Sequence, residues 1–213
     1  MARQRIVYVT SSTFKTVENE AFVKHCTLAD GSKVLDLFDF QIRRENIIET
    51  LEVDLDAMVR AEATAAYEQT RVPCVVEHAG LLFEGHAHYP GGLTKPMWNA
   101  LGERFVSETQ MSGRRATARA VVGYCDGMAV RTFTGDTMGT LVDPPRGSRD
   151  FYWDRVFVPD DPTGRVTSKT YAEIVEDLSL GLPYKMINFS QSAKAMLQFL
   201  EYRHVNRLPD LWQ

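Results

Sequence analysis

A polar segment with several hydroxyl side chains and one lysine follows the first apolar run of the chain. It reads Thr10-Ser11-Ser12-Thr13-Phe14-Lys15 and stands where a strand would turn into a helix. Free backbone N–H groups and the dipole at a helix N-terminus favour an anion there, and Lys15 adds a positive charge. No glycine-rich phosphate loop is present, so helix capping with a solvated lysine is the simpler alternative. The segment is a candidate phosphate contact through Thr10, Ser12 and Lys15.

Carboxylates gather ahead of one expected helix, in the set Glu49, Glu52, Asp54 and Asp56. Glu77 ends a separate apolar run. Hard cations such as Mg²⁺ prefer carboxylate oxygens and usually bridge to substrate phosphates. One carboxylate near Glu49, together with Glu77, could hold a metal–triphosphate unit. The alternative is a solvated loop whose acids stabilise a helix start.

His78 directly follows Glu77 at the end of an expected strand. Strand ends at a cleft mouth are favoured positions for function in α/β sheets. A histidine near its ordinary pKa could act as a general base. A hydrogen-bonded structural histidine is the alternative.

Aromatic rings, arginines and carboxylates interleave in the segment 145–155, which includes Phe151, Trp153 and Asp154. An aromatic ring can stack on a flat base, a carboxylate can read the edge of the base, and an arginine can meet phosphate. A strand with a core tryptophan and a surface ion pair would also explain the pattern.

The composition restricts the classes of partner. The 213 residues include 24 Lys and Arg against 28 Asp and Glu, for a formal net charge of −4. Proteins that coat nucleic acid usually carry a basic excess, so we expect no nucleic-acid polymer as a partner. A few local cations can still hold a small anion.

The sequence also indicates a compartment. No apolar stretch approaches the roughly 20 residues of a membrane helix, and the start Met1-Ala2-Arg3-Gln4-Arg5 lacks a signal-peptide core. The three cysteines, Cys26, Cys74 and Cys125, form no CxxC pair. We therefore expect a cytoplasmic protein without a membrane contact, a disulfide framework or a zinc site.

Hydrophobic periodicity predicts the elements that would position these residues. Strands are expected over 6–10, 34–38, 72–77, 115–124, 128–134 and 137–142. Helices are expected through 18–23, 55–66, 95–108 and 171–203. Asp126-Gly127 between apolar runs is a strong hairpin signal. Ser11-Ser12-Thr13 offers N-cap hydroxyls for the first helix, and Ser190 is a plausible cap of the last helix.

This order predicts an α/β fold with a mixed central sheet, flanking helices and a second, antiparallel lobe. We expect one domain over 1–213, with one lobe of approximately 1–85 plus 145–213 and the other of 86–144. A groove between lobes is a common ligand site.

Seven short motifs follow one another along the chain. They are Thr10 with Lys15 and Glu18, Glu49 with Glu52 as its rival, Glu77-His78-Ala79-Gly80-Leu81, Pro90-Gly91 with Lys95, Arg146-Gly147 with Phe151-Tyr152-Trp153-Asp154-Arg155 and Phe157, Thr170-Tyr171-Ala172-Glu173, and Ser190-Gln191-Ser192-Ala193-Lys194-Ala195. In this order and spacing, from Ile6 to about Arg203, the chain resembles the inosine triphosphate pyrophosphatase family.

The resemblance implies cleavage of a noncanonical purine nucleoside triphosphate to a monophosphate and pyrophosphate, with Mg²⁺ and in a homodimer. It implies metal binding by Glu49 and Glu77 and catalysis by Glu77 and His78. It implies nucleotide contacts from the set Thr10, Ser12, Lys15, Lys95, Phe151, Trp153, Asp154, Lys185, Ser190 and Gln191.

Several positions depart from the family pattern. His78 stands where the family has a metal-binding Asp, Gln191 and Ser192 replace a His-Arg pair, and Tyr152 replaces a glycine. Ser11 and Ser12 replace Gly and Asn, and the family lysine falls at Met186, one step from Lys185. Losing a transition-state contact commonly costs ~2.7–4 kcal/mol.

The main hypothesis is therefore a nucleotide sensor that binds a deaminated purine triphosphate such as ITP or dITP with weakened catalysis and reports to an effector protein. The alternatives are an active pyrophosphatase and a non-binding scaffold.

Overall fold

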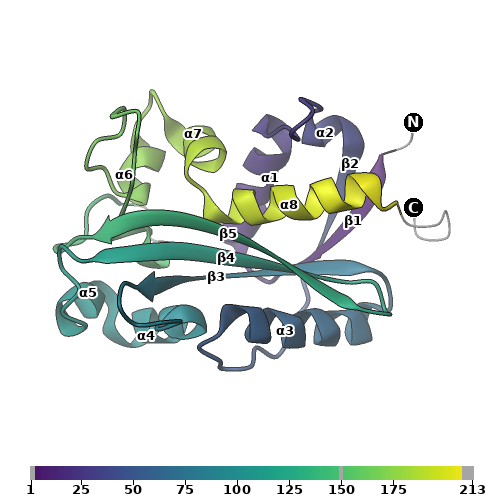
Figure 1. The fold of residues 1–213 in the computed structure, drawn as a ribbon, viewed down its shortest axis with the longest axis horizontal. Coiled ribbons are helices and arrows are strands. Elements are labelled where there is room, and N and C mark those ends of the chain that lie inside the picture. The colour runs from purple at the N-terminus through teal and green to yellow at the C-terminus, as the bar shows by residue number, and fades with distance from the viewer. Residues whose placement is uncertain (1–2, 149–150, 208–213) are drawn as a thin grey trace.

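The computed structural model describes residues 3–148 and 151–207 (Figure 1). Met1 and Ala2 of the N-terminal segment, and Arg149 and Asp150 of the aromatic segment, lie outside the described residues. Among the residues described, none of the helices combines the length and the apolar character needed to cross a bilayer.

One curved sheet of six strands forms the centre of the molecule, in the order β2-β1-β3-β4-β5-β6 (Figure 1). The strands are β1 (Gln4–Val9), β2 (Phe38–Arg43), β3 (Cys74–Phe83), β4 (Arg115–Cys125), β5 (Val130–Leu141) and β6 (Phe157–Pro159). β1 pairs in parallel with β2 and β3, whereas β3, β4, β5 and β6 pair antiparallel. The expected α/β fold with a mixed sheet is confirmed. The division into two lobes stays a prediction.

Helices cover both faces of this sheet (Figure 1). They are α1 (Thr13–His25), α2 (Val34–Leu37), α3 (Leu55–Thr70), α4 (Thr94–Leu101), α5 (Phe105–Glu108), α6 (Tyr171–Glu176), α7 (Gly181–Asn188) and α8 (Gln191–Val205). Short 3₁₀ turns lie at η1 (Gly91–Leu93), η2 (Gly102–Arg104) and η3 (Tyr152–Arg155). α1 and α8 pack on one face through buried residues such as Phe22 and Phe199. α3 packs on the other face through Val59 and Ala63.

Local signals set several of these boundaries. The Ser12 side chain accepts a hydrogen bond from the Lys15 N–H and starts α1. Ser190 accepts from the Ala193 N–H and starts α8, and Asp54 caps α3. The Asp126 carboxylate accepts hydrogen bonds from two turn N–H groups of the β4–β5 hairpin. The predicted caps at the starts of α1 and α8 and the predicted hairpin are confirmed, whereas the Asp54 cap was not predicted.

The predicted strand over 34–38 is wrong. Val34–Leu37 forms one helical turn, and β2 begins only at Phe38. Val34 and Phe38 are both fully buried whereas Leu35 is exposed, which is the four-residue spacing of a helix. Their apolar character alone had favoured a strand.

The expected break between strands 128–134 and 137–142 is also wrong, because β5 runs through both. Gly135 lies within it, and a Cβ there would stand 2.1 Å from the Gln191 carbonyl oxygen. The glycine therefore permits α8 to approach the sheet closely.

Two expected helices are divided. At Gly102, with a φ of 57°, α4 ends, so 95–108 forms α4, η2 and α5. The span 171–203 contains α6, α7 and α8. Strand β3 extends to Phe83, beyond the expected end at Glu77.

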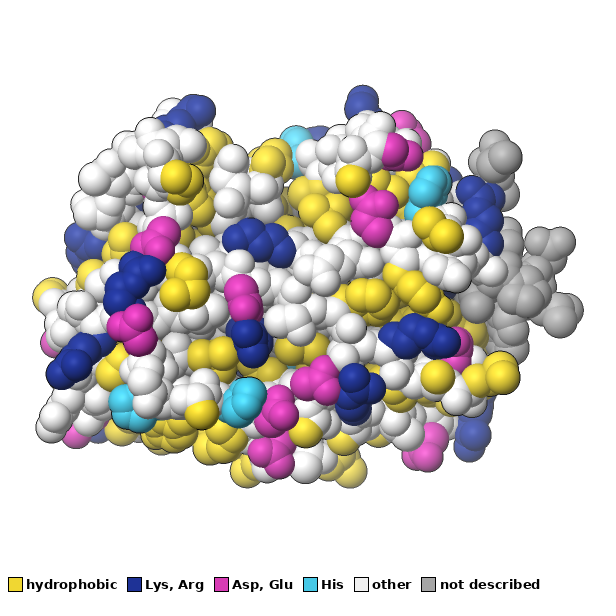
Figure 2. All heavy atoms as spheres, viewed as in Figure 1, with side chains coloured by type: hydrophobic (Ala, Val, Ile, Leu, Met, Phe, Trp, Pro, Cys, Tyr) yellow, Lys and Arg dark blue, Asp and Glu magenta, His cyan; other side chains and the backbone are white. Residues whose placement is uncertain are grey.

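Charges of both signs lie interspersed on the face seen in Figure 2. Ion pairs such as Arg119–Asp136, at 2.7 Å, join neighbouring strands β4 and β5. The mixed surface agrees with the nearly balanced charge of the chain.

Candidate active site

A cleft opens where four parts of the fold meet. Its walls come from the β1–α1 connection, the centre of β3, the segment Phe151–Trp153 and the start of α8. The loop after β2 and single residues of α3 and α4 complete the wall. Thus residues from both ends of the chain and from its centre share one cavity.

Lys15 lies at the floor of this cleft, against Glu77. Its ammonium group donates a hydrogen bond to the Glu77 backbone carbonyl and lies 3.5 Å from the Glu77 carboxylate. Because Lys15 is in the first turn of α1, it brings positive charge to a helix N-terminus. This is the arrangement expected for a phosphate contact.

The Glu77 carboxylate is held by further donors. Tyr8 donates its hydroxyl to Glu77 Oε2 at 3.0 Å, and Ser192 donates to Oε1 at 3.1 Å. Burial, together with the Glu77 charge, raises the pKa of Tyr8 well above its ordinary value, so Tyr8 remains a donor. Glu77 is thereby fixed between β1, α1 and α8.

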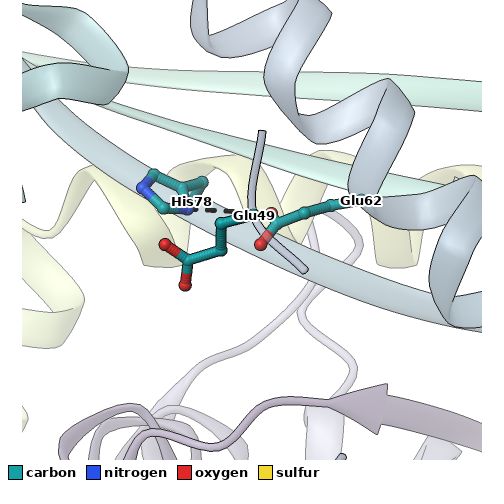
Figure 3. Close-up of side chains that lie close together, drawn as sticks. All are labelled: Glu49, Glu62 and His78. Carbon is teal, nitrogen blue, oxygen red and sulfur yellow. Dashed lines mark ion pairs between the residues drawn. The ribbon is translucent and has the colours of Figure 1, made fainter. Parts of the chain in front are cut away.

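His78 faces the opposite side of the sheet, since successive strand residues alternate. There it meets Glu62 of α3, with its Nδ1 3.7 Å from Glu62 Oε2. Glu49, from the loop after β2, completes a cluster whose three ligand atoms lie within 4.8 Å of one another (Figure 3). We call these three residues the Glu49–Glu62–His78 cluster.

Lys95 of α4 lies 3.1 Å from Glu49. Burial raises the pKa of the Glu49 carboxyl, but the charges of Lys95 and His78 and the Lys95 hydrogen bond outweigh burial and leave the pKa below its ordinary value. Glu49 is therefore ionised at neutral pH. The structure brings Glu49 together with Glu62 and His78 rather than with Glu77, its expected metal-binding partner.

Sequence reasoning overlooked Glu62 as a site residue. It fits the helical spacing of Met58 and Ala66 within the expected helix over 55–66, and it received no role of its own. The available signal was its chemistry, since a glutamate on an apolar helix face is rarely buried without a partner.

The aromatic wall of the cleft is formed by Phe151, Tyr152 and Trp153. The Phe14 ring packs on Phe151 with centroids 4.8 Å apart, and Trp153 packs against Tyr171 behind the wall. Tyr152 has a φ of 44°, in the left-handed region that favours glycine.

A buried ion-pair network lies behind the aromatic wall. Lys185 Nζ is 2.7 Å from the Asp154 carboxylate and 3.0 Å from that of Glu18. Lys185 and Asp154 are almost fully buried and lie outside the lining of the cleft. Lys185 and Asp154 therefore support the aromatic wall from behind.

Gln191 begins α8 and lines the cleft. The Tyr171 hydroxyl shares its proton between the Phe189 carbonyl, at 2.9 Å, and the Gln191 amide oxygen, at 3.2 Å. This contact fixes the amide oxygen and leaves the amide NH₂ as a donor. Gln191 can therefore present a donor to a ligand.

The expected site residues divide into two groups. Most of them line the cleft, in the set Thr10, Ser12, Lys15, Glu49, Glu77, His78, Lys95, Phe151, Trp153 and Gln191. Asp154, Lys185 and Ser190 do not, and Ser190 serves as the cap of α8.

The mixed sheet and this cleft define an α/β protein with a candidate ligand site lined by lysines, carboxylates and aromatic rings. A family model described as the Ham1 family matches residues 6–202, and the chain belongs to that family. The family-level resemblance inferred from the sequence is confirmed.

Named relatives agree with this assignment. The chain is 28% identical over 212 residues to the inosine triphosphate pyrophosphatase of Saccharomyces cerevisiae, covering 97% of this chain and 99% of that protein. It is 30% identical over 182 residues to the dITP/XTP pyrophosphatase of Methanopyrus kandleri, covering 81% of this chain and 88% of that protein. The structure of a HAM1 protein from Coxiella burnetii superposes with a TM-score of 0.65 at 19% identity, over 95% of this chain and 99% of the other, and shows the same fold.

Proposed function

We propose that this chain hydrolyses a noncanonical purine nucleoside triphosphate, of the inosine or xanthosine type, to a monophosphate and pyrophosphate. The observation that carries the proposal is the meeting of Lys15, the aromatic wall and the Glu49–Glu62–His78 cluster in one cleft. Relatives named dITP/XTP pyrophosphatase support hydrolysis better than binding alone.

In this proposal the purine base stacks on the Phe151 side of the aromatic wall. Gln191 donates an amide hydrogen bond to an oxygen on the base edge, which inosine and xanthosine carry at the position of the adenine amino group. The phosphates extend toward Thr10, Ser12 and Lys15. Lys15 then exchanges its contact with Glu77 for a phosphate oxygen.

Hydrolysis at the α-phosphorus needs a base and a stabilised leaving group. A water oxygen attacks the α-phosphorus while the bond to the α–β bridging oxygen breaks, and pyrophosphate leaves. The water proton passes to the Glu77 carboxylate, which lines the same cleft. Lys15 and Lys95, which both line the cleft, offset the charge on the phosphates.

Binding without turnover is the second candidate. The resemblance drawn from the sequence implies an Asp in place of His78 and an Arg in place of Ser192. The Ser192 hydroxyl carries no charge and donates a hydrogen bond to Glu77. This is the sensor hypothesis drawn from the sequence. The effector partner, the homodimer and the cytoplasmic location stay predictions.

A paired measurement separates the two candidates. Pyrophosphate release and calorimetric binding are followed with dITP, ITP and XTP, and with dATP as the control nucleotide, in Mg²⁺ and separately in Mn²⁺. Hydrolysis predicts pyrophosphate from the noncanonical nucleotides and its loss in Lys15→Ala. Binding of dITP without pyrophosphate in either metal would leave only the sensor role, and absence of binding would overturn both candidates.

A further inference from the structure

The Glu49–Glu62–His78 cluster has the composition of a metal site, with two carboxylates and one imidazole. Its three ligand atoms lie within 4.8 Å of one another (Figure 3). They come from the loop after β2, from α3 and from β3, so folding alone brings them together. The side chains of His78 and Glu62 are only 6% and 10% exposed.

Glu62 carries an unsatisfied atom at the centre of this cluster. Its Oε2 is buried and has no hydrogen-bond donor among residues 3–148 and 151–207. The facing His78 Nδ1, at 3.7 Å, is too distant for a hydrogen bond. A buried carboxylate oxygen without a donor is costly, and a cation between Glu62 and His78 would satisfy it.

Packing does not explain why α3 has a glutamate at this position. Its neighbours on the buried face are apolar, among them Val59, Ala63 and Ala66. An apolar residue at position 62 would avoid the desolvation of a carboxylate. The acidic group therefore points to a ligand.

The donor set does not fit the Mg²⁺ that the family resemblance implies. Mg²⁺ demands an octahedral shell and is bound in proteins through oxygen. Imidazole nitrogen suits divalent transition metals, and mixed nitrogen and carboxylate sets select them over Mg²⁺. His78 thus shifts the metal preference of the site from Mg²⁺ toward divalent transition metals.

Lys95 does not block such a site. It contacts Glu49 at 3.1 Å, but a carboxylate has about four lone-pair positions and can meet an ammonium group and a metal together.

We propose that Glu49, Glu62 and His78 bind one divalent transition-metal ion, of the Mn²⁺ or Co²⁺ class, in preference to Mg²⁺. The inference deepens the proposed function, on which it rests for the role of the ion beside the triphosphate. Metal binding itself is measured without nucleotide.

The test uses the full chain and Mn²⁺ as the probe. Calorimetry gives the affinities for Mn²⁺ and Mg²⁺, and electron spin echo envelope modulation of bound Mn²⁺ detects a coordinated imidazole nitrogen. We expect one Mn²⁺ per chain, bound at least ~10-fold more tightly than Mg²⁺, with a nitrogen signal. Equal affinity for the two ions, or bound Mn²⁺ without the nitrogen signal, would overturn the proposal.

Three variants locate the ion. Glu62→Gln removes a ligand charge with little change in shape and should weaken Mn²⁺ binding at least ~10-fold, since even groups behind a ligand cost that much. His78→Asp should abolish the nitrogen signal and move the preference toward Mg²⁺. Glu68→Gln changes an exposed residue of the same helix and should leave Mn²⁺ affinity unchanged. Unchanged Mn²⁺ affinity in folded Glu62→Gln would place the ion elsewhere.

The outcomes separate this inference from the proposed function. Mn²⁺ binding with the nitrogen signal but no pyrophosphate release refutes hydrolysis and keeps the metal site. Pyrophosphate release in Mg²⁺ by a chain without Mn²⁺ preference refutes the metal site and keeps hydrolysis.

Discussion

Replacing Lys185 with methionine tests the ion-pair network that supports the aromatic wall. Lys185 Nζ lies 2.7 Å from Asp154 and 3.0 Å from Glu18. The three side chains are 3%, 1% and 10% exposed, respectively. Lys185→Met fills similar space but removes the ion pairs that Lys185 makes with two buried carboxylates.

Breaking a buried ion pair by removing one partner costs about 3–5 kcal/mol, because the remaining charge is uncompensated. For a chain of this length each kcal/mol lowers the melting temperature by roughly 2–4 °C. We therefore expect Lys185→Met to melt about 6–20 °C below the unchanged protein.

Urea denaturation followed by circular dichroism measures the free energy of unfolding. The matched control is Arg104→Met, which breaks the pair between Arg104 and Glu108. That pair has side chains 68% and 51% exposed and should contribute about 0–1 kcal/mol.

A cost below about 1 kcal/mol at neutral pH, equal to that of the control, would contradict the reasoning.

Three further results are expected. Burial raises the pKa of Cys26 and Cys74 to about 11. At pH 8, alkylation of these thiols by iodoacetamide should therefore run about 200-fold slower in the native protein than in urea, and it should accelerate toward pH 11. Equal alkylation rates in the native protein and in urea would refute the burial of these thiols. Gly80→Ala should lower the free energy of unfolding, measured by urea denaturation, by about 1–3 kcal/mol, because the added Cβ would lie 2.2 Å from the Gly91 carbonyl oxygen. An unchanged free energy of unfolding would contradict this packing. Lys15→Met should weaken dITP binding by about 10- to 100-fold in calorimetry, the value of a charge-assisted hydrogen bond, whereas unchanged affinity would remove Lys15 from the phosphate site.

Short-range signals in the sequence predicted much of the fold. Ser12 and Ser190 cap their helices because each side chain needs only an N–H three residues away. The Asp126-Gly127 hairpin is equally local. The segment 34–38 failed because its apolar residues suit both a strand and a helical turn, and only packing against the sheet selects between them.

In the candidate site, too, local sequence patterns predicted some residues, whereas contacts between residues distant in the sequence were not predicted. Lys15 was predicted because it stands at a helix start, and Gln191 because it falls in the last motif of the family resemblance. Glu62 was not assigned a role, since its meeting with His78 requires α3 to pack across β3. The contact of Lys185 with Glu18 spans 167 positions, a separation that no local pattern reports.

Hydrolysis of dITP by the cleft is the central claim, and pyrophosphate release tests it most directly. Purified protein is mixed with dITP in Mn²⁺ or Mg²⁺, and dIMP and pyrophosphate are quantified together. The proposed function predicts equal amounts of both products at an ordinary enzymatic rate, of order 10 s⁻¹, with loss of turnover in Lys15→Ala. Tight binding of dITP with neither product in either metal would contradict it.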